Sequence, residues 1–214
     1  MVESALPTQT TPLIGRETEL AEVLKRLGKP ESRLLNVVGP GGVGKTRLAI
    51  EAARQVKTSY SEGVAFVDLQ PVEAADLITA VADTLPFTLS GSEKPQEQLL
   101  SYLQDKDLLL LLDNFEHLLD RVPFLSTLLA QSPGVNLLLT SREAIHLEEE
   151  WLYPLQGLSV PDGSGSENLD DYSSVQLFLE QAHRLDPNFS LEEKGESVAR
   201  ICQLVEGLPL ALEL

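Results

Sequence analysis

The eight residues at 39–46, Gly-Pro-Gly-Gly-Val-Gly-Lys-Thr, constrain the fold of this chain more than any other feature. They match the pattern G-x-x-x-x-G-K-[ST], in which glycines let backbone N–H groups close around phosphate oxygens. An apolar stretch at residues 33–38 precedes them, and apolar side chains at helical spacing follow from Lys45 onward. A strand before the loop and a helix N-terminus after it are the expected setting, because the helix end carries positive potential. The motif therefore predicts an α/β fold with a nucleotide-binding loop.

Two side chains at the end of this loop have a predicted chemical role. The Lys45 ammonium can neutralise β- and γ-phosphate oxygens, and the Thr46 hydroxyl can bind Mg²⁺. We therefore expect ATP or ADP, with Mg²⁺, as the cofactors. The predicted phosphate-binding residues are Gly41, Gly42, Val43, Gly44, Lys45, Thr46 and Arg47.

Five consecutive leucines, residues 108–112, lead directly into Asp113 and Asn114. An apolar run of this length is typical of a central strand that is covered on both faces. A carboxylate at the end of such a strand can hold Mg²⁺ beside the phosphate loop, so we assign Asp113 to the metal together with Thr46. Asn114 cannot accept a proton, which leaves Glu116 as the only acid in this turn. Glu116 is then either the base that activates water or a solvated carboxylate at a helix start.

Arg142 follows the stretch at residues 135–140, which we predict to be another strand. The carboxyl ends of parallel strands meet at one edge of a sheet, where ligands bind. Arg142 is therefore expected near the γ-phosphate, since its guanidinium suits phosphate oxygens; the alternative is an exposed loop arginine. The candidate catalytic residues are thus Asp113, Glu116 and Arg142.

Apolar strand patterns alternate with helical stripes along the first three quarters of the chain. Strands are predicted at residues 33–38, 64–69, 107–112, 135–140 and 151–155. This alternation is typical of an α/β fold with a doubly wound, mainly parallel sheet. A helix is predicted at residues 118–130, in which Pro123 either kinks the helix or starts its second half. Gly28 follows another helical stripe, at a position that favours a left-handed cap.

The composition changes after residue 160, where Gly and Ser become frequent. We expect a flexible lead-in at 1–12, a P-loop nucleotide-binding domain at 13–160, a linker at 161–169 and a small helical domain at 170–214. In the last of these, Ser190 and Glu193 have the spacing of a capping box at a helix start. The helical pattern is interrupted at Leu214, so we expect the natural protein to continue.

The charge and the cysteine count exclude several functions. The formal net charge is −17, which disfavours direct binding of nucleic acid by this segment because phosphate backbones are repelled. No run of 18 uncharged apolar residues is present, so no membrane span is expected. The N-terminus lacks the basic flank and apolar run of a secretion signal. The single cysteine, Cys202, can form neither an intramolecular disulfide nor a cysteine-rich zinc site. These features indicate a cytoplasmic location.

Six motifs occur in the order known from one family. They are LIGRE (13–17), GPGGVGKTRLA (39–49), LLLLLDNFEH (108–117), LLLTSRE (137–143), YPLQGLSVP (153–161) and GLPLALEL (207–214). In this combination the chain resembles the STAND class of P-loop ATPases, which contains the NB-ARC nucleotide-binding domains. It is most similar to the ATPase domains of bacterial LuxR-type and SARP-type transcriptional regulators. The motifs are spread over nearly the whole chain.

The resemblance implies a five-stranded sheet with the strand order 2-3-4-1-5. It also implies that Ile14, Gly15 and Arg16 flank the adenine. Arg142 would sense the γ-phosphate, and Pro209 would reach back from the helical domain to the nucleotide.

The resemblance further implies a signalling switch. ADP would hold the two domains closed, ATP would favour an open form that self-associates into a homo-oligomer, and weak ATPase activity would reset the switch slowly. Many relatives carry Asp at the position of Asn114, so this chain departs from the pattern beside Asp113. Sensor and effector domains would lie in missing parts of the full-length protein.

Two other functions are weighed against the switch. A ring motor of the AAA+ kind needs an arginine finger from a neighbour, yet residues 141–151 contain only Arg142 as a cation. A small-molecule kinase needs a lid rich in arginine, and residues 86–105 hold only Lys94. A GTPase is disfavoured because the guanine-reading tetrapeptide Asn-Lys-x-Asp does not occur.

Overall fold

The centre of the computed structural model, which describes residues 6–162 and 168–214, is a parallel sheet. The strands are β1 (Leu34–Val38), β2 (Val64–Asp68), β3 (Leu108–Asp113), β4 (Val135–Ser141) and β5 (Glu150–Pro154). Their spatial order is β2-β3-β4-β1-β5. Val38 pairs with both Ser141 and Pro154, which brings the carboxyl ends of three strands to one edge. The predicted fold class and strand order are therefore confirmed.

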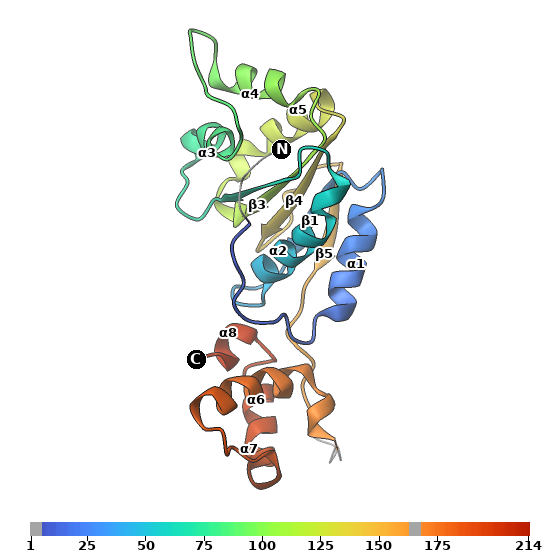
Figure 1. The fold of residues 1–214 in the computed structure, drawn as a ribbon, viewed down its shortest axis with the longest axis vertical. Coiled ribbons are helices and arrows are strands. Elements are labelled where there is room, and N and C mark those ends of the chain that lie inside the picture. Colours follow the sequence, from blue (N-terminus) through green and yellow to red (C-terminus); the bar gives the residue numbers. More distant parts are fainter. Residues whose placement is uncertain (1–5, 163–167) are drawn as a thin grey trace.

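Helices cover both faces of this sheet (Figure 1). They are α1 (Glu17–Leu27), α2 (Lys45–Val56), α3 (Leu77–Asp83), α4 (Pro95–Leu103) and α5 (Val122–Gln131). Leu109 and Leu111 of β3 belong to the core beneath α1 and α2, whereas Leu110 and Leu112 belong to the core beneath α3, α4 and α5. Neighbouring leucines thus point to opposite faces, which explains why β3 is an unbroken apolar run.

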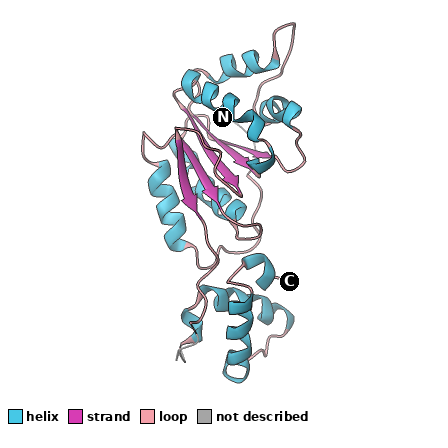
Figure 2. Ribbon diagram, turned by 180° about the vertical axis from the view of Figure 1, so that it is seen from behind, coloured by secondary structure: helices cyan, strands magenta, loops and turns pink. Residues whose placement is uncertain are grey.

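Three further helices lie beyond the carboxyl ends of the strands (Figure 2). They are α6 (Ser173–Leu185), α7 (Leu191–Leu204) and α8 (Pro209–Leu212). These helices have a small core of their own, formed by Leu158, Val175, Leu177, Val198, Cys202 and Leu212. The backbone N–H of Leu210 donates to the Gly42 carbonyl oxygen at 3.2 Å, so α8 contacts the phosphate loop.

The start of α5 differs from the sequence prediction. The helix begins at Val122 rather than at residue 118, and two 3₁₀ turns, Phe115–His117 and Leu119–Arg121, precede it. Pro123 lies in the first turn of the helix, where its missing N–H has no helical partner to lose. Pro123 therefore starts this helix and does not kink it.

Two predicted helix caps, one at the end of α1 and one at the start of α7, are wrong in detail. Gly28 follows α1 with φ −78°, and its N–H donates to the Leu24 carbonyl oxygen at 3.0 Å, so the chain continues the helical turn without a left-handed cap. Ser190 precedes α7 as expected, but its side chain makes no capping hydrogen bond to the described part of the chain. Glu192 and Glu193 in the first turn still favour this helix start through the helix dipole.

The segment at residues 6–12 forms no helix or strand and lies against α2. Arg54 donates to the Pro7 carbonyl oxygen at 3.2 Å, and the Gln9 amide donates to the Arg47 carbonyl oxygen at 2.9 Å. Residues 1–5 of the expected lead-in and 163–167 of the expected linker lie outside the described residues, and the division into two domains stays a proposal. Among the described helices, none is both long enough and apolar enough to cross a membrane.

Candidate functional site

The phosphate loop joins β1 to α2, and its path depends on glycine. A Cβ atom on Gly39 would lie 2.5 Å from the Leu155 carbonyl oxygen, so no larger residue fits there. Gly42 and Gly44 have φ values of +79° and +97°, which other L residues rarely adopt. The loop can therefore turn its backbone tightly in front of α2, as phosphate binding requires.

Lys45 opens α2 and is almost fully buried beside the loop. Its Nζ atom donates to the Gly39 and Pro40 carbonyl oxygens at 2.9 and 3.1 Å. Burial lowers the pKa of Lys45, and the carboxylate of Glu116 opposes that shift. The ammonium is thus held at the loop by backbone carbonyls, in a position where phosphate oxygens would be equally good partners.

Asp113, at the end of β3, is buried and accepts hydrogen bonds from three neighbours. The Thr46 hydroxyl lies 2.8 and 3.0 Å from its two carboxylate oxygens, and the Thr140 hydroxyl donates to Oδ1 at 2.5 Å. The Asn114 amide donates to Oδ2 at 3.0 Å. Burial raises the pKa of Asp113, while the hydrogen bonds from Thr140 and Thr46 oppose the shift.

The contact between Thr46 and Asp113 gives a donor set that fits Mg²⁺. Hydroxyl and carboxylate oxygens are hard ligands, and Mg²⁺ in nucleotide sites is usually held by one or two protein groups, phosphates and water. The contact also brings together the two residues that the sequence assigns to the metal.

Glu116 and Arg142 face each other across the mouth of the site. The Arg142 Nε atom lies 3.0 Å from Glu116 Oε1, and the arginine side chain is 68% exposed. The other carboxylate oxygen, Oε2, is buried and has no hydrogen-bond partner among the described residues. A Cβ atom on Gly41 would be 3.9 Å from Arg142 Nη2, so the guanidinium lies over the phosphate loop. These two of the three predicted catalytic residues therefore lie at the loop, but they are paired with each other.

A cavity of about 670 Å³ lies in front of the loop, a volume in the range of small-molecule sites. Predicted residues that line it are Gly41, Gly42, Gly44, Lys45, Thr46, Arg47, Glu116, Arg142 and Pro209. Further lining residues, which are not among the predicted site residues, are Gln70, Asn114, His117, Leu210 and Glu213. Gln70 and His117 closely follow β2 and β3. They could have been found from the sequence, because ligands bind at the edge where the carboxyl ends of parallel strands meet. Leu210 and Glu213 come from α8 and do not follow a strand, so this position rule could not have found them.

A second, much smaller cavity lies where the adenine is expected. It has a volume of about 20 Å³, enough for about one water molecule. Its lining residues are Leu13, Ile14, Arg16, Val43, Gly44, Arg47, Leu158, Leu177 and Pro209. Ile14, Arg16 and Pro209 thus lie together at this cavity, and Leu158 lies within the YPLQGLSVP motif (153–161), whereas the sequence did not indicate Leu177.

The two neighbours of Ile14 in the predicted adenine set are held by other contacts. Gly15 has φ +61°, and a Cβ atom there would overlap the Ser173 side chain at the start of α6. Arg16 is buried and donates to the Gln156 and Val43 carbonyl oxygens at 2.6 and 3.2 Å. Gly15 therefore lines neither cavity, and Arg16 ties the N-terminal segment to the loop.

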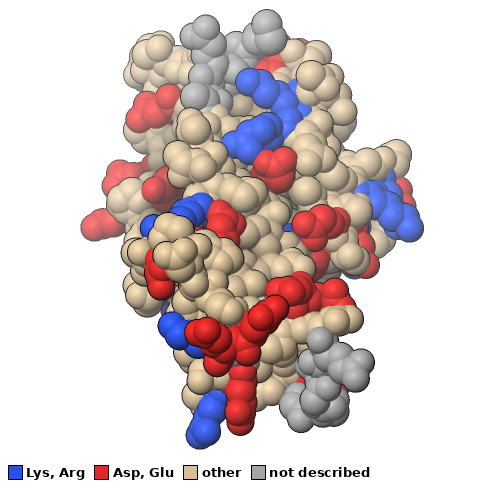
Figure 3. All heavy atoms as spheres, turned by 60° about the horizontal axis from the view of Figure 1, so that its bottom comes forward, with Lys and Arg blue, Asp and Glu red and all other residues tan. Residues whose placement is uncertain are grey.

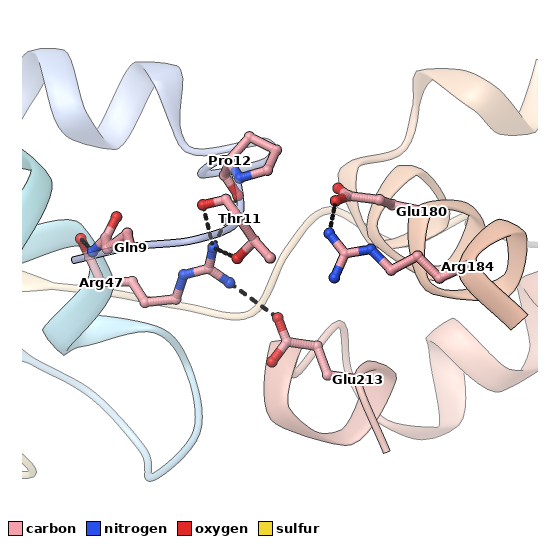
Figure 4. A network of polar contacts seen from close by, with 7 residues as sticks. All are labelled: Gln9, Thr11, Pro12, Arg47, Glu180, Arg184 and Glu213. Carbon is pink, nitrogen blue, oxygen red and sulfur yellow. Dashed lines mark hydrogen bonds and ion pairs between the residues drawn. The ribbon is translucent and has the colours of Figure 1, made fainter.

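Arg47 links three parts of the chain (Figure 4). Its guanidinium forms an ion pair with Glu213 at 3.0 Å. It also donates to the Thr11 hydroxyl at 2.6 Å and to the Pro12 carbonyl oxygen at 2.9 Å. Figure 4 shows a separate ion pair between Arg184 and Glu180, which stays within α6. Arg47 thus joins α2 to the N-terminal segment and to the C-terminal end.

Acidic side chains gather on the face that brings the helical end forward (Figure 3). Among the acidic residues of the helical end, Asp170 and Asp171 lie in one 3₁₀ turn, and Glu192 and Glu193 lie in the first turn of α7. This acidic face agrees with the formal net charge of −17.

A parallel sheet of this order, with a G-x-x-x-x-G-K-[ST] loop between its first strand and the next helix, defines the P-loop class of nucleotide-binding proteins. The model of the NB-ARC domain matches residues 16–147, and the chain belongs to the NB-ARC family. The predicted relationship to NB-ARC-like STAND ATPases is therefore confirmed.

Two relatives carry the names of regulators. A putative HTH-type transcriptional regulator of Mycobacterium tuberculosis is 32% identical over 186 residues, which are 86% of this chain and 20% of that protein. The regulatory protein AfsR of Streptomyces griseus is 31% identical over 149 residues, 64% of this chain and 15% of AfsR. The chain thus spans a fifth or less of the length of these relatives.

A solved structure with the same fold is the STAND protein with a tetratricopeptide repeat sensor from Pyrococcus horikoshii. It superimposes with a TM-score of 0.61 over 97% of this chain and 30% of that protein, at 17% identity. This likeness supports the fold assignment independently of the motifs.

Proposed function

We propose that this chain is the ATP/ADP-binding switch domain of a larger transcriptional regulator. ADP joins the sheet to helices α6–α8 in a closed arrangement, and exchange for ATP favours an open form that self-associates. Different contacts with the two nucleotides supply the free energy for this change. The observation that carries the proposal is the large cavity, because residues of the phosphate loop and of α8 line it together.

The residues of the cavity have complementary roles in this proposal. Lys45 neutralises the β- and γ-phosphates, and Thr46 with Asp113 holds Mg²⁺. The metal, when bound, would add positive charge beside the phosphates. Arg142 turns from Glu116 to the γ-phosphate, and the buried Oε2 atom of Glu116 accepts a proton from the attacking water.

Hydrolysis is slow in this proposal for two reasons. The Asn114 amide cannot act as a base, and Glu116 and Arg142 are paired with each other before nucleotide arrives. We therefore expect turnover far below the median enzyme rate of about 10 s⁻¹. Turnover of tens per second by the monomer would favour a motor or another dedicated ATPase.

Adenine binding is coupled to the helices. A cavity of about 20 Å³ is too small for a purine, so binding of the base at this place requires lining side chains to move, among them Leu177 of α6 and Pro209 of α8. Gly15 and Arg16 fix the backbone on the other side of the base. The position of the helical part then depends on whether nucleotide is bound.

The relatives suggest the setting of the switch. A regulator of their kind would carry its sensor and its DNA-binding output in parts beyond this segment, which itself is too acidic to bind nucleic acid. Nucleotide-dependent self-association would pass the signal on, and a cytoplasmic location stays a prediction.

Calorimetry with ADP and with Mg²⁺-ATP tests the nucleotide site. We expect the folded Lys45→Ala variant to lose roughly 2–5 kcal/mol of binding free energy, because a buried charge-assisted contact to phosphate is removed. Lys57→Ala, at an exposed lysine that follows α2, is the matched control. GTP at a comparable concentration should fail to displace ATP. Unchanged ATP affinity in Lys45→Ala would show that the loop does not hold the triphosphate.

A further inference from the structure

The connection between β4 and β5, residues 142–149, returns along the sheet without a helix. A parallel strand pairing requires such a return, and a helix usually provides it. Here Ile145 is buried and Leu147 packs against the core beneath α5. Backbone N–H groups of a partly buried loop need partners, which a helix would have supplied internally.

Glu150 supplies these partners. Its carboxylate accepts hydrogen bonds from the backbone N–H groups of Ile145 at 3.0 Å and His146 at 2.9 Å. His146 has φ +60°, an uncommon conformation that this contact holds. The sequence alone suggests a solvated acidic turn at residues 148–150. Glu148 and Glu149 are indeed exposed, but Glu150 is only partly so.

Asn36 connects this carboxylate to the centre of the sheet. The residue is fully buried in β1, and its Nδ2 atom donates to Glu150 Oε1 at 2.7 Å and to the Glu143 carbonyl oxygen at 3.4 Å. Its Oδ1 atom has no partner among the described residues. A buried unpaired oxygen costs stability, so this amide is poorly explained by packing alone. The N–H groups of the Asn36 amide instead hold the loop that begins at Arg142.

The network fixes the backbone on both sides of Arg142. Ser141 belongs to β4, and its hydroxyl accepts from the Glu143 N–H at 3.3 Å. Asn36 holds the Glu143 carbonyl, and Glu150 holds the following turn. The Arg142 side chain itself is 68% exposed and has Glu116 as its ion-pair partner. The direction in which the guanidinium leaves the sheet therefore depends on these backbone contacts.

We propose that Glu150, together with Asn36, is a positioning residue that aims Arg142 at the γ-phosphate. The inference rests on the proposed function, in which Arg142 makes that contact. An exposed arginine loses side-chain freedom when it binds phosphate, and a fixed backbone reduces that loss. Glu150 therefore sets the preference for ATP over ADP without touching either nucleotide.

The test compares the dissociation constants of ADP and of the non-hydrolysable analogue adenylyl imidodiphosphate, both measured by calorimetry with Mg²⁺. Glu150→Ala should reduce the preference for the triphosphate by about 5- to 10-fold, a normal size for coupling between sites, and leave ADP affinity within about twofold. Glu150→Gln, which keeps one acceptor, should lie between. Glu148→Ala, at an exposed neighbour in the same acidic turn, should match the wild type.

A double variant separates positioning from general stability. Arg142→Ala should remove the triphosphate preference, and adding Glu150→Ala to it should change nothing more, because the two residues act through one contact. Equal losses for both nucleotides in Glu150→Ala would make Glu150 a merely structural residue and overturn the inference. If Glu150→Ala lowers the preference equally in the Arg142→Ala background, Glu150 does not act through Arg142.

The Arg142→Ala variant distinguishes failure of the proposed function from failure of the inference. If Arg142→Ala keeps the wild-type preference, Arg142 is not the γ-phosphate contact, and the proposed function loses that residue and the inference with it. If only Arg142→Ala lowers the preference, the proposed function stands and the inference is wrong. If Glu150→Ala does not fold, Glu150→Gln is used in its place. The inference is overturned if the backbone N–H groups of residues 145 and 146 exchange hydrogen faster in this variant while the preference for the triphosphate is unchanged.

Discussion

Asp113 accepts its side-chain hydrogen bonds from neutral neighbours among the described residues. Thr46, Thr140 and Asn114 all donate hydrogen bonds to it, whereas Lys45 donates to carbonyl groups of the loop. Burial raises the pKa of Asp113, and the hydrogen bonds from Thr140 and Thr46 oppose this shift, together with the positive charge of Lys45. Asn114 is the most specific of the three, since φ +63° places it in a left-handed conformation that Asn tolerates well.

We predict that Asn114→Asp destabilises the metal-free protein by about 1–3 kcal/mol, because it replaces a donor to Asp113 with a second carboxylate. The melting temperature in EDTA at pH 7 should fall by about 2–4 °C per kcal/mol for a chain of this size. Asn114→Gly is the control, because it removes the donor without adding charge and accepts positive φ. The deficit should shrink as the pH falls towards 4, where the added carboxyl group protonates. Equal melting of the Asp and Gly variants at pH 7 would argue against repulsion.

At the scale of elements, the strands differ in how they are covered. Every residue of β3 is buried, and its leucines divide between the two cores. β5 lies at the edge of the sheet, where Leu152 is 44% exposed although Tyr153 beside it is buried. An apolar residue therefore has a different energetic role in each strand, although both strands run parallel to their neighbours.

We predict that Leu110→Ala and Leu111→Ala each cost about 2–5 kcal/mol of the free energy of unfolding, because each leaves a cavity under a different helix layer. Leu152→Ala should change stability by less than about 1 kcal/mol, since the side chain already contacts water. Urea unfolding of the three variants measures the differences. A cost for Leu111→Ala near that of Leu152→Ala would mean that α1 and α2 do not cover β3 firmly.

At the scale of the whole molecule, the site lies between the sheet and the C-terminal helices. The Arg47–Glu213 ion pair and the hydrogen bond from Leu210 to Gly42 cross this boundary. Both ion-pair partners are about 30% exposed, and an ion pair of this kind contributes only about 0–1 kcal/mol. These contacts alone are weak, so a ligand in the cavity would decide how firmly the helices are held.

We predict that ADP raises the melting temperature and lowers the radius of gyration. Binding to the closed form alone adds about 2.7 kcal/mol at a hundredfold excess over the Kd. A fragment without residues 168–214 should bind ADP more weakly, because Leu177, Pro209 and Leu210 are lost from the two cavities. Circular dichroism checks that the fragment is folded. ADP affinity equal to that of the whole chain would remove the helices from the site and end the switch model.

The sequence by itself determined the features that depend on neighbours along the chain. The glycine loop, the apolar run before Asp113 and the alternation of strands and helices each require only local order, because backbone conformation and burial pattern are encoded over a few residues. The family resemblance added the strand order, which the structure confirms. It also indicated Ile14, Arg16 and Pro209, which meet at the small cavity.

Only the tertiary structure decided which side chains meet across the fold. Nothing local distinguishes Glu150 from Glu148, yet it is the Glu150 carboxylate that accepts from Asn36, a residue 114 positions earlier. The pairing of Glu116 with Arg142 and the contact of Leu210 with Gly42 likewise join distant segments. The physical reason is that such contacts depend on the path of each connecting loop and on the direction of each side chain. Both are fixed only after the sheet and the helices have packed together.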